Sequence, residues 1–385
     1  MDITPVIVVV GYNRIESLRR LLSCLEKAIY HDEVTLIISI DYGGPSIIAT
    51  YAKNFVWSHG NKIVKLHTKN LGLKKHILEC GDYSISYGAA IIFEDDIMPS
   101  PYFYEYVKQA VNFYKNDKRI FAVSLYSQLW NGYANRVFAP IRNEYDAFIS
   151  QIECSWGECF IGERWKEFKK WYEKNEEQLL PRKDVPEVVF NWQESYSKYL
   201  LYYIVENELY YLTPYESYTT NFHKSGTHAQ TASLAYQVPL MYGEKQLVFP
   251  EYEKAIMYDA FFESIILKRI LEKKFSGAKI CVDYYGLHSN YSDYDIGIST
   301  AELPYKVIAS YGLELRPPEL NYIWEIQGKD IFLYDFKCVK KNKKRKRHHY
   351  NLIYYDVKDL QWIDSLFYTL YQLWEKMLNK IKSKG

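Results

Sequence analysis

The first third of the chain alternates between short apolar runs and amphipathic stretches. Runs rich in β-branched residues predict buried strands at 6–10, 34–40, 63–67, 89–93 and 120–125. Between them, apolar residues at helical spacing predict helices at 15–30, 47–57, 73–87 and 101–115. Strands that alternate with helices form right-handed βαβ units. We therefore expect an α/β protein whose mainly parallel sheet is flanked by helices.

The rest of the chain is harder to interpret from its pattern. Helical spacing predicts helices at 162–175, 186–209, 258–274 and 360–381. Residues 276–335 show no clear period and are expected to form a mixed extension. The sequence thus predicts a first domain at 1–235, an extension at 236–335, and a C-terminal segment at 336–385.

Three polar sites follow directly after predicted strands. The most informative is the acidic triplet Glu94-Asp95-Asp96, which an apolar strand would deliver to the edge of the sheet. Adjacent carboxylates repel one another unless a cation or a helix N-terminus compensates them. Carboxylate oxygens suit Mg²⁺ or Mn²⁺, which commonly hold substrate phosphates as well. The alternative interpretation is an acidic turn that caps the following helix.

Arg14 lies in the turn after the first predicted strand, and Asp41 directly follows the second. In parallel sheets, ligands bind beyond the carboxyl ends of the strands. There a guanidinium could meet a phosphate, and Asp41 could accept a hydrogen bond from a base or ribose. A surface arginine and a turn-forming aspartate are the alternatives. The stretch 70–76, which ends in His76, could cradle a phosphate or base at a helix N-terminus, but it lacks a P-loop pattern.

Composition narrows the class of protein and its compartment. The 385 residues carry a net charge of +1, so no global field favours nucleic acid as a partner. The six cysteines form no CxxC pair or zinc pattern, and they are expected to be free thiols in a reducing compartment. No signal peptide or membrane-spanning run is evident, which favours a cytoplasmic location.

Taken together, these features resemble the GT-A (Rossmann-like) class of nucleotide-sugar glycosyltransferases. The stretch 93–106, FEDDIMPSPYFYEY, is similar to the metal motif and following helix of the N-acetylglucosaminyltransferase I family, which starts complex N-glycan branching. Further similar segments occur in the expected order at 10–14, 39–43, 122–124 and 155–165. The resemblance covers about the first 235 residues, and residues 240–385 have no counterpart.

The resemblance implies roles for individual residues. Asp96 would bind the metal, Asp95 the ribose, and Glu94 the sugar or a metal-bound water. Arg14 and Asp41 would line the nucleotide pocket, with His76 near the base. Glu194, in the sequence Asn191-Trp192-Gln193-Glu194-Ser195, resembles the catalytic base, although Gln193 replaces the family's preceding acid. A solvated helix residue is the alternative for Glu194, and Asp184 and Glu187 are rival bases.

A later segment, 220–228, resembles the family's mobile loop that closes over the bound nucleotide sugar. Lys224 and Ser225 could then reach the diphosphate, and Gly226 suits a hinge. An ordinary exposed loop is the alternative interpretation.

These features predict an inverting, metal-dependent glycosyltransferase. It would move a sugar, GlcNAc in the resembling family, from a nucleotide-diphosphate donor such as a UDP-sugar. The acceptor would be a glycan or lipid-linked hydroxyl in surface polysaccharide or glycoconjugate assembly. The alternatives are a nucleotidyltransferase and a non-catalytic carbohydrate-binding or scaffold subunit.

The C-terminal segment predicts a surface-binding function. Eight Lys or Arg occur between 337 and 347, and an apolar stripe follows at helical spacing over 363–381. A basic, aromatic, amphipathic helix is typical of monotopic attachment to an anionic membrane, here the inner leaflet. Packing of the stripe on the catalytic domain, or on a second copy in a homodimer, is the alternative.

Overall fold

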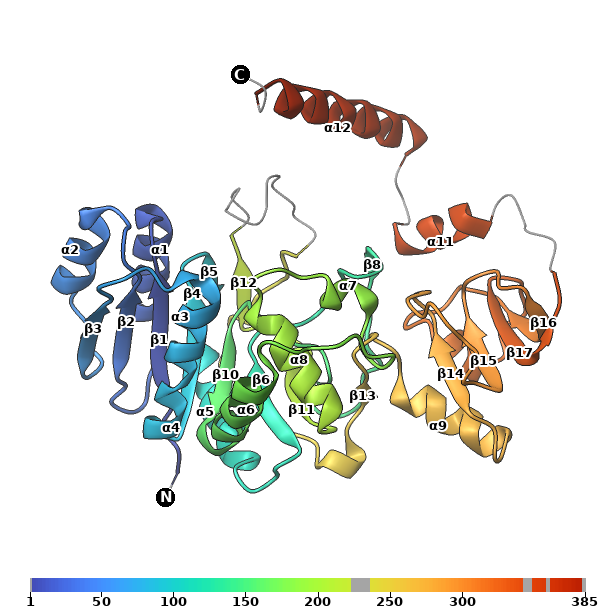
Figure 1. The fold of residues 1–385 in the computed structure, drawn as a ribbon, viewed down its shortest axis with the longest axis horizontal. Coiled ribbons are helices and arrows are strands. Elements are labelled where there is room, and N and C mark those ends of the chain that lie inside the picture. The colour runs from blue at the N-terminus through green and yellow to red at the C-terminus, as the bar shows by residue number, and fades with distance from the viewer. Residues whose placement is uncertain (1, 223–235, 342–347, 358–360, 383–385) are drawn as a thin grey trace.

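The protein is described here by a computed structural model, which places residues 2–222, 236–341, 348–357 and 361–382. A large central sheet occupies the first two thirds of the chain, and a smaller sheet follows beside it (Figure 1). The central sheet has nine strands in the order β13-β9-β11-β6-β10-β4-β1-β2-β3. The predicted α/β class with a mainly parallel sheet is confirmed.

The predicted βαβ units are present in the first part of the chain. Strands β1 (Val6–Gly11), β2 (Leu36–Ile40), β3 (Lys62–Leu66) and β4 (Ala89–Glu94) lie side by side and parallel. The intervening helices are α1 (Ile15–Glu26), α2 (Ser46–Asn54), α3 (Gly72–Gly81) and α4 (Tyr83–Tyr87). The helix predicted at 73–87 is therefore two helices.

The sheet continues beyond β4 through strands of both directions. The short strand β10 (Glu158–Ile161) runs antiparallel to β6 (Ile120–Ser124). The short strand β9 (Ala147–Ser150) runs antiparallel to β11 (Tyr210–Pro214). Strand β13 (Met257–Tyr258) closes this edge. Two small ladders pair β5 (Ile97–Pro99) with β12 (Thr219–Asn221), and β7 (Trp130–Asn131) with β8 (Arg136–Val137).

Apolar side chains cover both faces of the central sheet. Successive residues of β1 point to opposite faces, so Ile7 and Val9 join one core while Val6 and Val8 join the other. Helices α1, α2 and α5 (Phe103–Phe113) cover the first face. Helices α3, α6 (Gly162–Asn175) and α8 (Tyr196–Glu206) cover the second. Burial on both faces explains why the parallel strands have no polar alternation.

Residues 276–335, which the pattern left unassigned, contribute to a second sheet. Its order is β14-β15-β17-β16, formed by Ile280–Asp283, Ile296–Ser299, Ile331–Val339 and Tyr305–Tyr311 respectively. Helix α9 (Ile265–Lys274) packs Leu267 and Leu271 against this sheet. The short helix α10 (Leu320–Ile323) completes this part, whereas η1 (Tyr252–Lys254) packs through Tyr252 on the central sheet.

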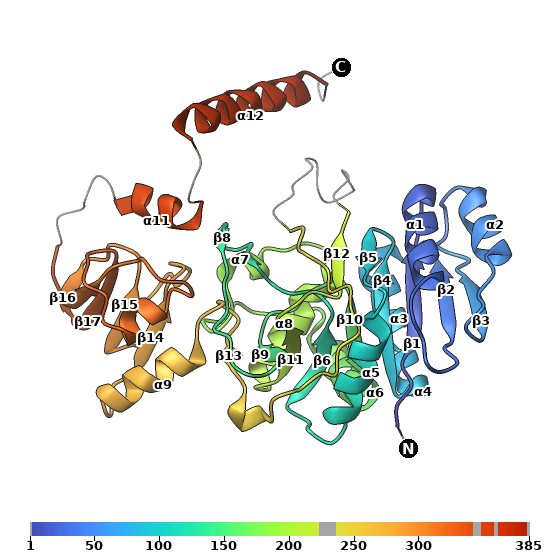
Figure 2. The same ribbon diagram turned by 180° about the vertical axis from the view of Figure 1, so that it is seen from behind.

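The last two helices differ in how they meet the rest of the molecule. Helix α11 (His348–Asp356) packs on the second sheet, whereas α12 (Trp362–Lys382) stands apart from the body in two opposite views (Figures 1 and 2). Among the helices that the structure describes, none combines the length and apolarity needed to cross a membrane.

Three predictions of extent differ from the structure. The helix expected at 186–209 is broken into α7 (Glu187–Phe190) and α8, and the helix expected at 258–274 begins at Ile265. Tyr258 instead belongs to a strand. The third is the helix expected at 73–87, which is divided into α3 and α4. The central sheet extends to β13, beyond residue 235, and β17 of the second sheet spans residue 335.

Candidate active site

The carboxyl ends of three neighbouring strands meet at one edge of the central sheet. Val10 of β1 lies in register with Glu94 of β4, and Gly11 lies in register with Ile40 of β2. The three strands therefore end side by side. The segments that carry Arg14, Asp41 and the acidic triplet begin next to one another at this edge of the sheet. The sequence predicted this gathering from strand order alone.

The loops after β1 and β2 are packed tightly against each other. A Cβ atom added at Gly44 would lie 2.0 Å from the backbone oxygen of Tyr12. Only glycine can occupy this position without moving the backbone. The loop that follows Asp41 is thus fixed against the loop that carries Arg14.

Arg14 bridges the last two acids of the triplet. Its Nη1 donates to Asp96 Oδ2 at 2.9 Å, and its Nη2 forms an ion pair with Asp95 Oδ1. The guanidinium therefore supplies the cation that adjacent carboxylates need. Asp95 is buried, whereas the Asp96 side chain keeps 31% of its surface exposed.

The surroundings of the triplet favour the protonated form of its first two acids. Burial, reinforced by the charges of Asp96 and Asp95, raises the pKa of Glu94 to about 8. Burial also raises the pKa of Asp95 to about 6, against the opposing effect of Arg14. At neutral pH Glu94 is therefore largely protonated, whereas Asp95 is largely ionised.

The triplet can accommodate a divalent cation only with help from a ligand. Among the residues that the structure describes, no three His, Cys, Asp or Glu side chains converge as a metal cage. Asp96 has an exposed carboxylate edge next to the Arg14 contact. Mg²⁺ and related ions are often held by one or two carboxylates together with substrate phosphates and water. Asp96 fits this kind of site as its single protein ligand.

Asp41 holds the backbone of a neighbouring loop. Its Oδ1 accepts from the backbone N–H groups of Tyr42 at 2.8 Å and Leu71 at 2.9 Å. Its Oδ2 accepts from Leu71 at 3.2 Å and Gly72 at 3.0 Å. These contacts occupy the positions at which the carboxylate can accept hydrogen bonds. They also hold the start of α3 against the end of β2. In this arrangement Asp41 positions the edge of the site.

His76 lies beneath the edge and not at its surface. It is 2% exposed, and its Nε2 lies 2.7 Å from Ser39 Oγ. Burial, together with the neighbouring His67, lowers the pKa of His76 to about 4, so its ring is neutral at physiological pH. The structure therefore places His76 within the packing of α3 against the sheet.

The β5–β12 ladder begins directly after the triplet, because β5 starts at the residue that follows Asp96. Asn221 pairs with Ile97, and the backbone N–H of Phe222 donates to the carbonyl of Asp96 at 2.8 Å. Arg20 of α1 stacks on the Phe222 ring, with 3.5 Å between the guanidinium carbon and the ring centroid. Lys224 and Ser225 lie outside the described residues. The segment that carries them thus leaves the described structure next to the triplet.

Arg20 was missed by the sequence interpretation. Its charge acts on Asp95, and its buried Nε and Nη2 atoms have no hydrogen-bond partner among the described residues. A basic residue on the first helix after β1 is a weak signal in sequence, because surface helices commonly carry arginine. Its proximity to the triplet becomes evident only once β12 is placed.

Glu194 lies in the break between α7 and α8. It is exposed and has a φ of 48°, a conformation that is uncommon for residues other than glycine. Ser195 then caps α8 by accepting from Lys198 N at 3.4 Å. The alternative interpretation as a solvated helix residue is wrong in one respect, because Glu194 is not helical.

Glu194 is near Tyr196, a residue that reaches the triplet with its side chain. Tyr196 is two residues further on, a span of about 7 Å at most. Its hydroxyl lies 3.5 Å from Glu94 Oε1. The rival Asp184 is held by Arg182 through two contacts of 2.9 and 2.7 Å. Glu187 begins α7 on the surface.

A buried acid cluster, Glu94, Glu153 and Glu158, lies behind the edge and was not predicted. Glu158 Oε2 accepts from the Tyr211 hydroxyl at 3.0 Å, while Oε1 of Glu153 and Oε1 of Glu158 are buried and accept no hydrogen bond from the part of the chain that the structure describes. Burial raises the pKa of Glu153 to about 7, and burial and Glu153 raise that of Glu158 well above its usual range. The only sequence signal was a glutamate within the short run 158–161.

Comparisons with known proteins give structural matches alone. No protein-family model matches the sequence, and no curated protein sequence matches it. One similar solved structure is the mannosyltransferase PcManGT from Pyrobaculum calidifontis in complex with GDP-Man and Mn²⁺, at 14% identity and a TM-score of 0.36. The alignment covers 56% of this chain and 55% of that one.

Two further structures are similar to a comparable degree. S. aureus TarS 1–349 aligns at 13% identity and a TM-score of 0.34, covering 56% of this chain and 59% of that one. Mouse xyloside xylosyltransferase 1 in its apo form aligns at 9% identity and a TM-score of 0.35, covering 54% and 84%. The chain thus spans little more than half the length of the first two proteins.

Proposed function

We propose that the protein is a GT-A glycosyltransferase that moves a sugar, with inversion, from a nucleotide-diphosphate donor to an acceptor hydroxyl. The observation that carries this proposal is the meeting of Arg14 with Asp95 and Asp96 at the carboxyl ends of β1, β2 and β4. Such an edge is where α/β sheets bind nucleotides. The resemblance of the stretch 93–106 to the N-acetylglucosaminyltransferase I family supports the same reaction and favours UDP-GlcNAc.

The nucleotide would lie against the loops after β1 and β2. Arg14 provides a guanidinium for the donor phosphates, and Asp95 would accept a hydrogen bond from the ribose. Asp41 would act by holding Leu71 and Gly72 in place, since its carboxylate oxygens are already used. His76 would act only from beneath the base, because it is buried. Lys224 and Ser225 would close over the diphosphate from the segment after β12.

A divalent cation, Mn²⁺ or Mg²⁺, would be held by Asp96 together with the donor phosphates. When bound, such an ion neutralises the negative charge that develops on the leaving diphosphate. Arg14 contacts Asp96 in the structure and would share this neutralisation. Glu94, which shares the triplet's edge, would contact the transferred sugar.

Glu194 would accept the proton of the acceptor hydroxyl as that oxygen attacks the anomeric carbon. It is exposed, and Tyr196, two residues further along the chain, reaches Glu94 of the triplet with its hydroxyl. Asp184 is a poorer candidate, because Arg182 already engages both of its carboxylate oxygens. Glu187 remains the alternative on geometric grounds.

The acceptor would be a glycan or lipid-linked hydroxyl, in the assembly of a surface polysaccharide or glycoconjugate on the cytoplasmic side of a membrane. A nucleotidyltransferase is the first alternative, but the turn Tyr12-Asn13-Arg14 lacks the Gly- and Lys-rich loop that binds a triphosphate. A non-catalytic carbohydrate-binding subunit is the second alternative, and it would not need Glu194.

The deciding experiment measures donor hydrolysis and transfer across a panel of nucleotide sugars, with and without Mn²⁺. We expect turnover of one diphosphate sugar that depends on the metal and on Asp96. Release of pyrophosphate from a nucleoside triphosphate would instead indicate nucleotidyl transfer. Binding of glycans without any turnover would indicate the non-catalytic alternative.

A further inference from the structure

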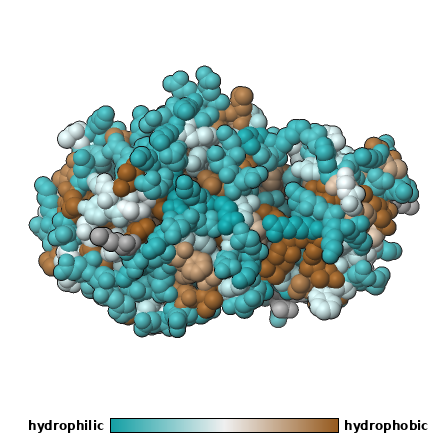
Figure 3. Space-filling model, turned by 90° about the horizontal axis from the view of Figure 1, so that it is seen from below, coloured by the Kyte–Doolittle hydropathy of each residue, from teal (hydrophilic) through white to brown (hydrophobic). Residues whose placement is uncertain are grey.

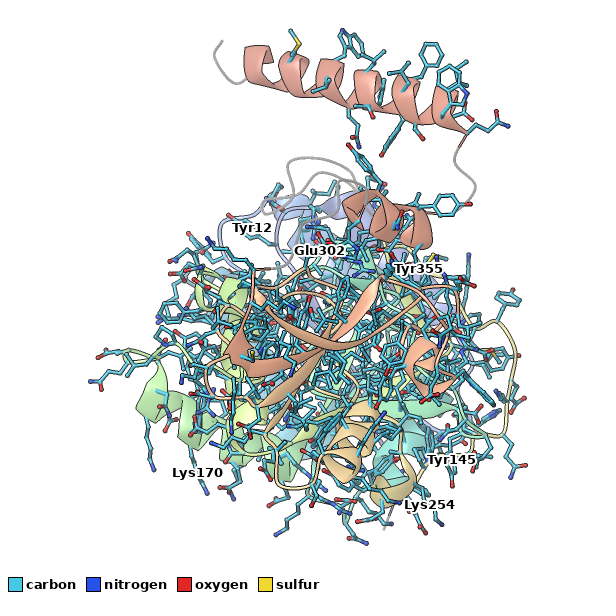
Figure 4. All side chains as sticks on the ribbon, turned by 90° about the vertical axis from the view of Figure 1, so that its right-hand side faces the viewer. Tyr12, Tyr145, Lys170, Lys254, Glu302 and Tyr355 are labelled. Carbon is cyan, nitrogen blue, oxygen red and sulfur yellow. The ribbon has the colours of Figure 1, made fainter. Side chains whose placement is uncertain are left out.

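Helix α12 carries an apolar stripe that no other described part of the chain covers. Spacings of three and four residues place its large side chains on one face, and more than half of the surface of Phe367 (64%), Trp374 (56%) and Met377 (65%) is exposed. Figure 4 shows the side chains of this helix standing clear of the body. The members with described side chains are Ile363, Leu366, Phe367, Leu370, Leu373, Trp374 and Met377.

Aromatic residues with a polar tip border the stripe. Trp362 and Tyr371 flank it on α12, Tyr368 is exposed on the opposite face of that helix, and Tyr350 and Tyr354 are exposed on α11. Tryptophan and tyrosine are enriched where a protein meets the boundary between lipid and water. The polar residues of α12 include Asp364, Ser365 and Gln372.

The charge of the chain is divided sharply at the start of this region. Residues 337–385 contain 13 Lys and Arg against four Asp and Glu, a net charge of +9. The whole chain has a net charge of +1, so residues 1–336 carry −8. An anionic surface therefore attracts the C-terminal region and repels the body.

Helix α11, which precedes α12, is held by hydrogen bonds to residues 1–336. Asp356 accepts from Arg136 Nε at 2.8 Å, and the Tyr355 hydroxyl donates to Leu315 O at 2.6 Å. Arg136 also donates to Tyr284 O at 3.0 Å and so links β8, in the small β7–β8 ladder, with the end of β14 in the second sheet. Attachment through α12 would therefore hold the whole molecule.

We propose that α12 lies in the interface of an anionic phospholipid bilayer, with its apolar stripe among the acyl chains. The stripe provides hydrophobic burial and the neighbouring cations provide attraction to acidic headgroups, the two contributions that bind amphipathic helices to membranes. Figure 3 shows the face of the molecule that looks away from α12, where hydrophilic residues cover most of the surface. This inference does not depend on the proposed sugar transfer.

The charge division favours lipid over a second copy of the chain. Pairing two α12 helices would bring together two regions of +9 each, which repel one another. An anionic bilayer lowers the energy of the same charges. A homodimer through α12 is therefore an outcome for the experiment to test.

The test is flotation of the full-length protein with vesicles made of equal parts phosphatidylcholine and phosphatidylglycerol. The variant Leu370→Glu/Trp374→Glu places two charges on the stripe. The matched control, Ser365→Glu/Gln372→Glu, places the same two charges on the opposite face. We expect the stripe variant to lose at least about tenfold in vesicle partitioning and the control to retain most of it.

Two further measurements complete the test. Binding to pure phosphatidylcholine vesicles should be weaker, and added salt should weaken binding to the anionic vesicles, because salt screens exposed charge. Equal partitioning of the two variants would overturn the proposal. So would absence of vesicle binding together with a dimer, seen by light scattering, that the stripe variant alone dissociates.

Discussion

At the scale of single residues, a neighbouring arginine weakens the argument that the acidic triplet needs a metal ion. Three adjacent carboxylates suggested that a metal must compensate their repulsion, yet Arg14 already contacts two of them. The case for a metal therefore depends on Asp96, whose carboxylate retains an exposed edge.

The replacement Asp96→Ala should abolish metal-dependent nucleotide binding while leaving the fold intact. Arg14 keeps its partner Asp95 in this variant, so no buried charge is left alone. Calorimetric titration with UDP and Mn²⁺ should show a loss of at least about tenfold in affinity. The control Glu33→Ala, at the amino end of β2, should bind as the wild type does. An unchanged metal-dependent affinity would place the metal elsewhere.

The replacement Glu194→Gln should preserve donor affinity and lose most of the turnover. The amide retains the shape of the side chain but cannot accept the acceptor's proton. Loss of a general base costs about 10²–10⁴-fold in kcat. Glu187→Gln serves as the comparison, and a larger loss in that variant than in Glu194→Gln would transfer the role to Glu187.

The buried acid cluster predicts a stability that depends on pH. The folded-state pKa values of Glu94 and Glu153, about 8 and about 7, lie above those of an unfolded chain. The folded protein therefore holds protons that the unfolded chain releases, and its free energy of unfolding falls as pH rises from about 4.5 to 8.

The variant Glu153→Gln should reduce this fall, because its side chain stays neutral. We expect it to gain roughly 1–3 kcal/mol over the wild type at about pH 8.5 and little at about pH 4. Urea unfolding at the two pH values measures the difference. The exposed control Glu177→Gln should leave the pH profile unchanged, and a gain for Glu153→Gln that is equal at both values would contradict the explanation.

At the scale of elements, the parallel strands were predictable and the antiparallel ones were not. Strands such as β1 are continuous apolar runs because both faces are buried. Strand β10 has only four residues and includes Glu158, so its pattern resembles a loop. Its position between β4 and β6 depends on partners far along the chain, which local pattern cannot supply.

The candidate site likewise contains residues that could be predicted from the sequence and residues that could not. Arg14 and the triplet were predictable because strand order brings their ends together. Arg20, Glu153 and Tyr196 reach the site through the packing of helices and short strands. The break that exposes Glu194 was also unpredictable, since the flanking residues 186–209 keep a helical pattern across it.

Helix α11 should depend on the Arg136–Asp356 pair, which is largely buried. Removing one partner of a buried pair leaves the other charge uncompensated and is strongly destabilising. We expect Asp356→Ala to speed amide hydrogen exchange across 348–356 by at least about tenfold. The control Asp364→Ala, on exposed α12, should leave exchange in α11 unchanged. Unaltered protection in Asp356→Ala would show that other contacts hold the helix.

At the scale of the whole molecule, the last two helices should contribute very differently to stability. Truncation after Val357 removes α12, which buries no described surface, so the melting temperature should change by less than about 2 °C. Truncation after Lys341 leaves β17 whole but also removes α11 with its buried His348 and Tyr355, and it should lower the melting temperature clearly. Differential scanning calorimetry compares the two, and equal melting temperatures would contradict this account.

The division of charge between body and C-terminal region also makes the molecule a strong electric dipole, which its near-neutral isoelectric point of about 7.6 conceals. Within a screening length of an acidic surface, roughly 10 Å, opposite forces on the two ends produce a torque. The molecule then turns its C-terminal end toward the surface before any side chain touches it. Encounters become oriented, so a larger fraction of collisions leads to attachment, and this gain should vanish at high ionic strength.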